Sequence, residues 1–165
     1  MPGVATIPVA RPNWGRWEHY AAYAALIAIV LFFAFVRMRI RNIPLERDEG
    51  EYAYAGQLML QGIPPYQLAY NMKLPGTYAA YAAIMLVFGQ SESGIRIGVM
   101  LVNAASIVTV FFLARRFQGS LAGVVAAGTF GLLSARISVL GIYGHATHFV
   151  ALAAAGGGLA PSTGD

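Results

Sequence analysis

Carboxylates are concentrated in one short segment of the chain. Four of the seven acidic residues lie within six consecutive positions, Glu46-Arg47-Asp48-Glu49-Gly50-Glu51. A carboxylate there can accept a proton from a hydroxyl group, orient that group, or bind a hard cation. The segment follows an apolar run over residues 20–36 that has the length of a membrane span, and ionisable groups beside a bilayer are candidate functional sites. A solvated surface segment is the simpler alternative.

Asp48 and Glu49 are the candidate catalytic residues of this segment. Asp48 could instead be the N-cap of a helix, because Glu51 follows at the spacing of a capping box. Such a cap contributes about 1 kcal/mol to helix stability and requires no catalysis. On the residues alone, the two roles of Asp48 are equally favoured. A divalent cation held by Asp48, Glu49 and Glu51 is a third, less favoured interpretation.

Lys73 and two histidines are the other residues that could do chemistry. Lys73 directly precedes an apolar run, so it could bind a phosphate or anchor a helix at the membrane interface. His145 and His148 are three positions apart, a spacing at which two imidazoles on one helix can bind one metal ion. We favour a polar contact between helices for these histidines.

Six segments have the patterning and boundaries of helices. They cover residues 20–36, 48–60, 75–88, 94–114, 120–135 and 137–159. The segment 48–60 is amphipathic, whereas the others are apolar enough for a bilayer. We therefore predict an all-α fold, a polytopic membrane helix bundle of about five transmembrane helices with an amphipathic extracytoplasmic loop helix.

The composition supports a membrane protein and argues against other classes. Hydrophobic residues make up 58% of the 165 residues and charged residues only 11%, against about 25% in an average soluble domain. The chain has no cysteine, which excludes disulfides and thiolate metal sites. The net charge of +4 is scattered without a basic stripe, so nucleic acid is not an expected partner.

Three regions are expected along the chain. Residues 1–18 form an N-terminal lead, residues 19–160 form the membrane domain, with its first loop at 37–74, and residues 161–165 form a tail. A run of glycines at 156–158 followed by Pro161 breaks the helical pattern abruptly. From this break we expect the chain to be an N-terminal portion of a longer protein or a truncation product.

An ordered series of short motifs runs from residue 44 to residue 156. The motifs are Asp48-Glu49 with Tyr52-Ala53, Leu58-Met59-Leu60-Gln61-Gly62, Lys73-Leu74-Pro75, Phe88-Gly89 with Ser91-Glu92 and Arg96, and Leu113-Ala114-Arg115-Arg116-Phe117 with Gly119. In this series the chain resembles the N-terminal part of the polyprenyl-phosphate-sugar-dependent glycosyltransferases. These membrane enzymes of the GT-C type (family 39-like) include protein O-mannosyltransferases and the aminoarabinose transferase that acts on lipid A.

The resemblance implies a function and a set of site residues. The protein would move a sugar from a polyprenyl-phosphate donor to a lipid, glycan or protein acceptor. The family has an Asp at the start of the first extracytoplasmic loop, close to donor and acceptor, and Asp48 occupies that place beside Glu49. Lys73, helped by Arg47, would stabilise the departing phosphate. Tyr52 would line the path of the sugar.

The resemblance also implies what surrounds the site. No metal and no cofactor is expected, since Asn71-Met72 stand where some relatives have a carboxylate that can touch a metal. The arginines at positions 37, 39 and 41 could add to the positive charge that meets the phosphate. The expected location is the cell (inner) membrane, with a multi-pass chain and the first loop extracytoplasmic. The partners are then the lipid bilayer, the polyprenyl-phosphate-linked sugar and an acceptor.

Charge counting favours the opposite orientation. With the first loop outside and five crossings, four basic residues lie inside and seven outside, against the positive-inside tendency. Phosphate-binding residues would explain the excess outside. Two other functions stay open on the sequence: a non-enzymatic transporter or channel component whose acidic loop gathers cations, and an inactive truncation product.

Overall fold

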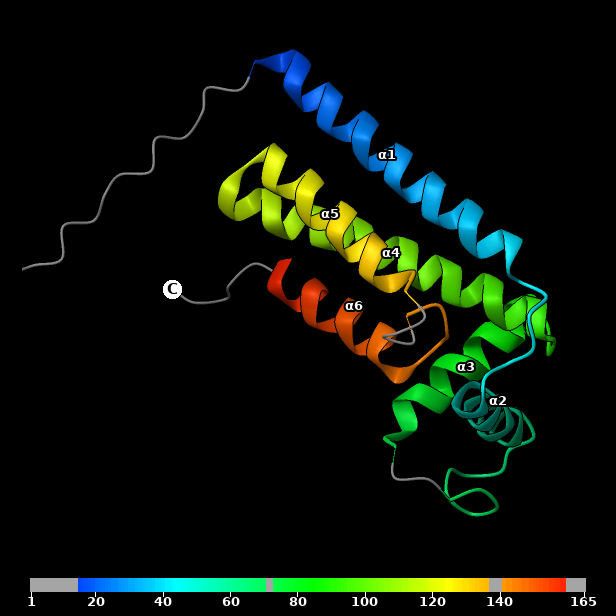
Figure 1. Cartoon of the computed structure of the whole chain (residues 1–165). Helices are drawn as coiled ribbons and strands as arrows, with labels where there is room; N and C mark the ends of the chain where they lie inside the picture. Colours follow the sequence, from blue (N-terminus) through cyan, green and yellow to red (C-terminus); the bar gives the residue numbers. More distant parts are fainter. Residues whose placement is uncertain (1–14, 71–72, 137–140, 160–165) are drawn as a thin grey trace, which may run out of the picture.

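The computed structural model describes residues 15–70, 73–136 and 141–159, and all the regular structure in these ranges is helical (Figure 1). The helices are α1 (Arg16–Arg39), α2 (Arg47–Leu60), α3 (Pro75–Phe88), α4 (Glu92–Gln118), α5 (Ser120–Ser134) and α6 (Ala146–Leu159). The predicted all-α fold is thus confirmed for the described residues.

The helices α1, α4, α5 and α6 form a bundle in which α1 and α4 run antiparallel (Figure 1). At one end, His19 Nδ1 lies 3.2 Å from the hydroxyl oxygen of Ser120. Near the other end, Arg37 donates from Nε to the amide oxygen of Asn103, over 3.2 Å. The end of α1 and the start of α4 therefore lie at the same end of the bundle.

Small residues allow the helices of this bundle to pack closely. An apolar core is shared by α1, α4 and α5; its buried members are Ala22, Leu26, Phe33, Ile107, Phe111 and Ala127. A side chain at Gly131 would overlap the ring of Phe33, so glycine is required where α5 meets α1. Close approach of this kind is the usual basis of packing between apolar helices.

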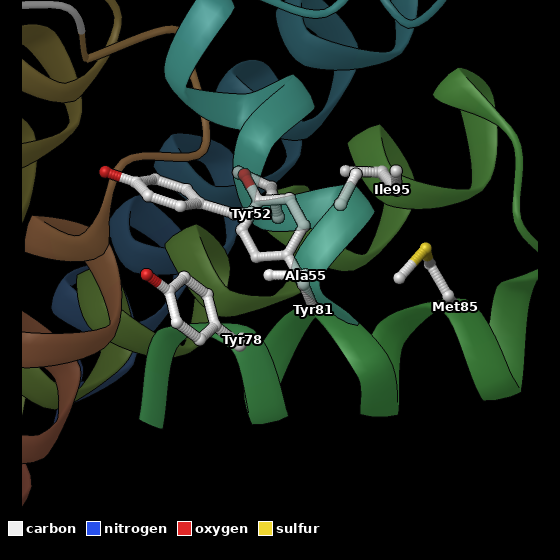
Figure 2. Packing of buried hydrophobic residues seen from close by; sticks show 8 residues of the cluster. Tyr52, Ala55, Tyr78, Tyr81, Met85 and Ile95 are labelled. Atoms are coloured by element: carbon white, nitrogen blue, oxygen red, sulfur yellow. The ribbon is translucent and has the colours of Figure 1, made fainter. Parts of the chain in front are cut away.

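The helices α2 and α3 pack together at the end of the bundle where α1 ends and α4 begins (Figure 1). The core that they share with the start of α4 holds three tyrosines that are almost fully buried, together with Met85 and, from α4, Ile95 (Figure 2). The ring of Tyr52 lies 6.3 Å from that of Tyr78 and 5.6 Å from that of Tyr81. Glycine at position 56 leaves room for Met85, so α2 and α3 come into close contact.

Two helices in the described part of the chain, α1 and α4, are long and apolar enough to cross a membrane. The apolar helices α3, α5 and α6 are shorter. In the most apolar 18-residue stretch of each helix, only 22% of α1 and 33% of α4 is buried. Large apolar side chains of α1 such as Leu31 and Phe35 therefore point outward. The structure thus supports two candidate spans, and it gives no support to the predicted number of about five.

The predicted helix boundaries are largely confirmed, with one correction. The segment 137–159 is not one helix, because residues 141–145 form a turn and α6 begins only at Ala146; residues 137–140 lie outside the described residues. The segment 75–88 forms α3 as predicted, and with 14 residues it is one of the shorter apolar helices. The lead up to residue 14 and the tail from residue 160 also lie outside the described residues.

Candidate functional site

The acidic segment forms the N-terminus of α2, and Glu46 is the capping residue. A Glu46 carboxylate oxygen accepts a hydrogen bond from the backbone N–H of Asp48 over 2.9 Å. In return, Glu49 accepts one from the backbone N–H of Glu46, also over 2.9 Å, which completes a capping box. The predicted pair of Asp48 and Glu51 is therefore wrong. The helix begins one residue earlier than expected, which moves the cap to Glu46 and leaves the side chain of Asp48 without a capping role.

Glu49 points into the protein and forms an ion pair with Arg96 of α4. Arg96 Nη2 lies 3.1 Å from Glu49 Oε2, and the two side chains are 4% and 0% exposed. Arg96 also donates to the backbone oxygen of Pro44 over 3.0 Å, so it fixes the segment that leads into α2 as well. A fully buried pair of this kind needs these hydrogen bonds to offset its loss of hydration.

The loop before α6 is held against Glu49 through Gly144. The N–H of Gly144 donates to Glu49 Oε1, and the Tyr81 hydroxyl donates to the oxygen of Gly144 over 2.6 Å. A side chain at position 144 would overlap the Tyr81 hydroxyl and Val99, so only glycine fits. Burial, with the Glu49 carboxylate nearby, raises the pKa of Tyr81, which keeps its hydroxyl protonated as a donor.

This attachment brings His145 to the acidic segment. His145 Nδ1 lies 3.8 Å from Asp48 Oδ2, and His145 Nε2 lies 3.8 Å from Glu46 Oε2. The side chain of Asp48 is 37% exposed and that of His145 is 13% exposed. The three side chains form a small polar site, which we call the Asp48 site, at the edge between α2 and the loop 141–145.

The loop is fixed from its other side by Arg37 and His148. Arg37 is buried and donates to the backbone oxygens of Ser134, Gly141 and Ile142 over 2.9, 2.7 and 3.1 Å. Nε2 of His148 lies 3.0 Å from the oxygen of Gly141. His148 thus contacts the loop that precedes its own helix rather than making the predicted contact between helices. His145 faces the acidic segment, and the two histidines do not converge on one site.

The structure does not bring the other predicted site residues to the Asp48 site. Arg47 and Lys73 are exposed, and neither makes a salt bridge within the described ranges. The Lys73 backbone oxygen accepts a hydrogen bond from Tyr66 over 2.6 Å, which fixes the backbone before α3. Tyr52 is fully buried between α2 and α3, where it packs against other rings and offers no surface to a sugar.

The cation candidates also differ from the sequence-based interpretation. Among the described residues, the potential ligands that lie close enough for one ion are Glu46, Asp48 and His145, not the predicted Asp48, Glu49 and Glu51. Glu49 is buried in its ion pair with Arg96, which separates its carboxylate from those of Asp48 and Glu51. Arg37 likewise makes its contacts inside the protein, so it is not available to a phosphate at the surface.

Sequence reasoning missed Arg96 and His145 as parts of this arrangement. A signal for Arg96 existed, because a charged residue inside an apolar helix usually has a buried partner. The sequence paired His145 with His148, and no local pattern linked Gly144 or His145 to the acidic segment, because that contact depends on the turn at 141–145.

Comparison with known proteins leaves the family open. No protein-family model matches the chain, no curated protein matches it, and no solved structure matches it. Function is therefore inferred from the geometry of the Asp48 site and from the motif resemblance.

Proposed function

We propose that this chain is part of a membrane glycosyltransferase that moves a sugar from a polyprenyl phosphate to a hydroxyl group of a lipid, glycan or protein. One observation carries the proposal: the carboxylate of Asp48 has no capping role and is partly exposed. It lies at the start of α2, directly after the first apolar helix. This is the place that the motif series assigns to the residue that activates the acceptor.

The reaction needs a proton acceptor and a positive charge. The acceptor oxygen attacks the anomeric carbon of the sugar, and the bond from that carbon to the phosphate oxygen breaks. The hydroxyl proton passes to the Asp48 carboxylate, and the polyprenyl phosphate departs with the bonding electrons. Exposed Lys73 and Arg47 are suited to stabilise the phosphate, provided that donor binding brings it to them.

We assign Glu49 a positioning role in this proposal. Both of its oxygens are engaged: Oε1 with Gly144 and Arg96, and Oε2 with Glu46 and Arg96. A buried carboxylate with these partners has no free oxygen for an acceptor. It instead fixes the helix that carries Asp48 relative to α4 and the loop 141–145.

The bundle and the α2–α3 layer suggest how the protein sits in the cell membrane. We propose that α1 and α4 cross the bilayer, that the shorter α5 and α6 accompany them, and that α2 and α3 lie together at the extracytoplasmic surface. The antiparallel course of α1 and α4 supports this arrangement, because it places both ends of the α2–α3 segment on one side. Asp48 would then lie where a lipid-linked donor presents its sugar.

The experiment is a transfer assay on membranes that contain the inserted protein. Polyprenyl-phosphate sugars, labelled in the sugar and carried on dolichyl or undecaprenyl chains, are supplied, and label is measured in lipid, glycan and protein fractions. We expect protein-dependent transfer from at least one of these donors and none from the matching nucleotide sugar. Absence of transfer from every donor of the class, with insertion demonstrated, would contradict the proposal.

A further inference from the structure

An open apolar groove lies where α4 ends and α5 begins. Its volume of about 590 Å³ falls within the range of about 300–1,000 Å³ that is typical of ligand clefts. Phe117, Leu121 and Val125 on its walls are more than half exposed, so the described part of the chain leaves the groove uncovered. The lining consists of six apolar side chains and one amide: Ala114, Phe117, Gln118, Leu121, Ala122, Val125 and Ala126.

The same end of the bundle carries an excess of positive charge. Arg115 and Arg116 lie in the last turn of α4, within the stretch that lines the groove. Arg16 begins α1 at this end, where α1 contacts the start of α5 (Figure 1). Glu18 is the only acidic residue in the described part of this end, so three positive charges meet one negative charge and leave a net charge of +2.

The two arginines beside the groove keep donors for an anion. The guanidinium carbon of Arg115 lies 4.9 Å from the centre of the Tyr23 ring, and Arg115 Nη1 donates to the Tyr23 hydroxyl. Arg116 is exposed, and its Nη1 lies 3.4 Å from the backbone oxygen of Leu159. Neither arginine pairs with a carboxylate within the described ranges. A guanidinium has five N–H groups, so each retains donors that can bind a phosphate.

Exposed aromatic rings place this end of the bundle at a membrane interface. Trp17 and Tyr20 of α1 are 71% and 74% exposed, and such rings are enriched at the level of the lipid headgroups. In the orientation proposed above, this end faces the cytoplasm, where anionic lipids attract basic residues beside a membrane span. An apolar helix would fill the groove but leave the arginines without a negative partner. A phospholipid supplies both an acyl chain and a phosphate.

We propose that the groove and its arginines bind an anionic phospholipid, with an acyl chain in the groove and the phosphate at Arg115 and Arg116. The ligand has a headgroup of net negative charge, as in phosphatidylglycerol, because the choline of a zwitterionic lipid would bring a second positive charge to the arginines. The groove lies at the opposite end of the bundle from the Asp48 site, so this proposal does not depend on the transfer reaction.

The test measures lipid preference at the groove, using the whole chain in bilayers of phosphatidylcholine. Trp14→Phe and Trp17→Phe remove the native indoles, and Phe117→Trp puts a single fluorescent reporter on an exposed wall of the groove. Brominated phosphatidylglycerol or brominated phosphatidylcholine quenches the reporter when it occupies the groove. The dependence of quenching on the lipid fraction gives the relative affinity. We expect phosphatidylglycerol to bind about tenfold more tightly.

Further variants separate the charges from the groove. Arg115→Gln combined with Arg116→Gln should reduce the preference to about twofold or less. The matched pair Arg39→Gln and Arg41→Gln removes exposed arginines at the other end of α1 and should leave the preference unchanged. Ala122→Phe fills the groove without changing a charge and should also lower the preference for phosphatidylglycerol.

A single substitution keeps the test decisive if the double variant does not fold. Arg116→Gln removes an exposed side chain, leaves the contact between Arg115 and Tyr23 intact, and should lower the preference about threefold. Equal affinity for the two lipids in the parent chain, or an unchanged preference in Arg116→Gln, would overturn the proposal. Protection of the reporter from both lipids, with cross-linking through the groove to a second copy of the chain, would also overturn it. None of these results bears on the transfer assay.

Discussion

Glu49 and Arg96 form a buried ion pair, with 3.1 Å between Oε2 and Nη2, that joins α2 to α4. The same glutamate accepts the backbone N–H groups of Glu46 and Gly144. Three segments that are far apart in the sequence therefore meet at one carboxylate. The position of Asp48 relative to His145 depends on this connection.

Loss of one partner of the pair should destabilise the protein strongly. In Arg96→Met the Glu49 carboxylate stays buried without its cation, a change that typically costs about 3–5 kcal/mol. The free energy of unfolding, measured by denaturant titration in mixed micelles, should fall by that order. The control Arg39→Met removes an exposed arginine and should change it by less than about 0.5 kcal/mol. Equal stability of the two variants would show that the pair is not formed.

Arg37 should matter for stability although it is charged and lies at the end of an apolar helix. Its guanidinium donates hydrogen bonds to the amide oxygen of Asn103 and to the backbone oxygens of Ser134, Gly141 and Ile142. In Arg37→Met these buried acceptors lose their donor, at about 1–3 kcal/mol each, while the release of a buried charge offsets part of the loss. We expect a net decrease of about 2–4 kcal/mol in the free energy of unfolding. An unchanged value would place Arg37 in solvent.

The loop 141–145 should not tolerate a side chain at Gly144. In Gly144→Ala the new methyl group meets the Tyr81 hydroxyl and Val99, so the loop must move away from Glu49. We expect faster hydrogen exchange at the amides of residues 141–145, together with a lower unfolding midpoint. Gly50→Ala is the matched control, because position 50 lies in α2 with open space around it and should gain up to about 1 kcal/mol.

The antiparallel course of α1 and α4 predicts a labelling pattern. The chain has no cysteine, so single cysteines at Gln67, Gln90 and Gln118, all exposed, report cleanly on which side each residue lies. A membrane-impermeant maleimide should label positions 67 and 90 from the same side of intact cells or spheroplasts, namely the outer side. Position 118 should be labelled only after permeabilisation. Labelling of 67 and 90 from opposite sides would restore α3 as a crossing helix.

Much of the fold could be predicted because helix ends carry local signals. Pro75 at the first turn and Gly89 after the last turn mark both ends of α3, and its predicted range is confirmed. Gly119 likewise separates α4 from α5 by adopting a backbone φ of +89°. These signals depend on the backbone of a few neighbouring residues, which is why the sequence was sufficient.

The arrangement of the site could not be predicted because it depends on contacts between distant segments. The capping box at α2 was assigned two residues too late, at Asp48 and Glu51 instead of Glu46 and Glu49, because the buried contacts of Glu49 that fix the observed box are made with distant segments. The turn at 141–145 is stabilised by Arg37 and Tyr81, which belong to other helices. Neither partner is visible in the local pattern of the turn.

The most direct test of the proposed function is sugar transfer by Asp48→Asn compared with Glu51→Gln, in membranes with equal amounts of inserted protein. The amide of the first variant keeps the shape of the side chain but cannot accept the proton of the acceptor hydroxyl. We predict that Asp48→Asn loses at least 100-fold in transfer rate while Glu51→Gln stays within about twofold of the wild type. Wild-type transfer by Asp48→Asn would contradict the assignment of Asp48 as the catalytic carboxylate.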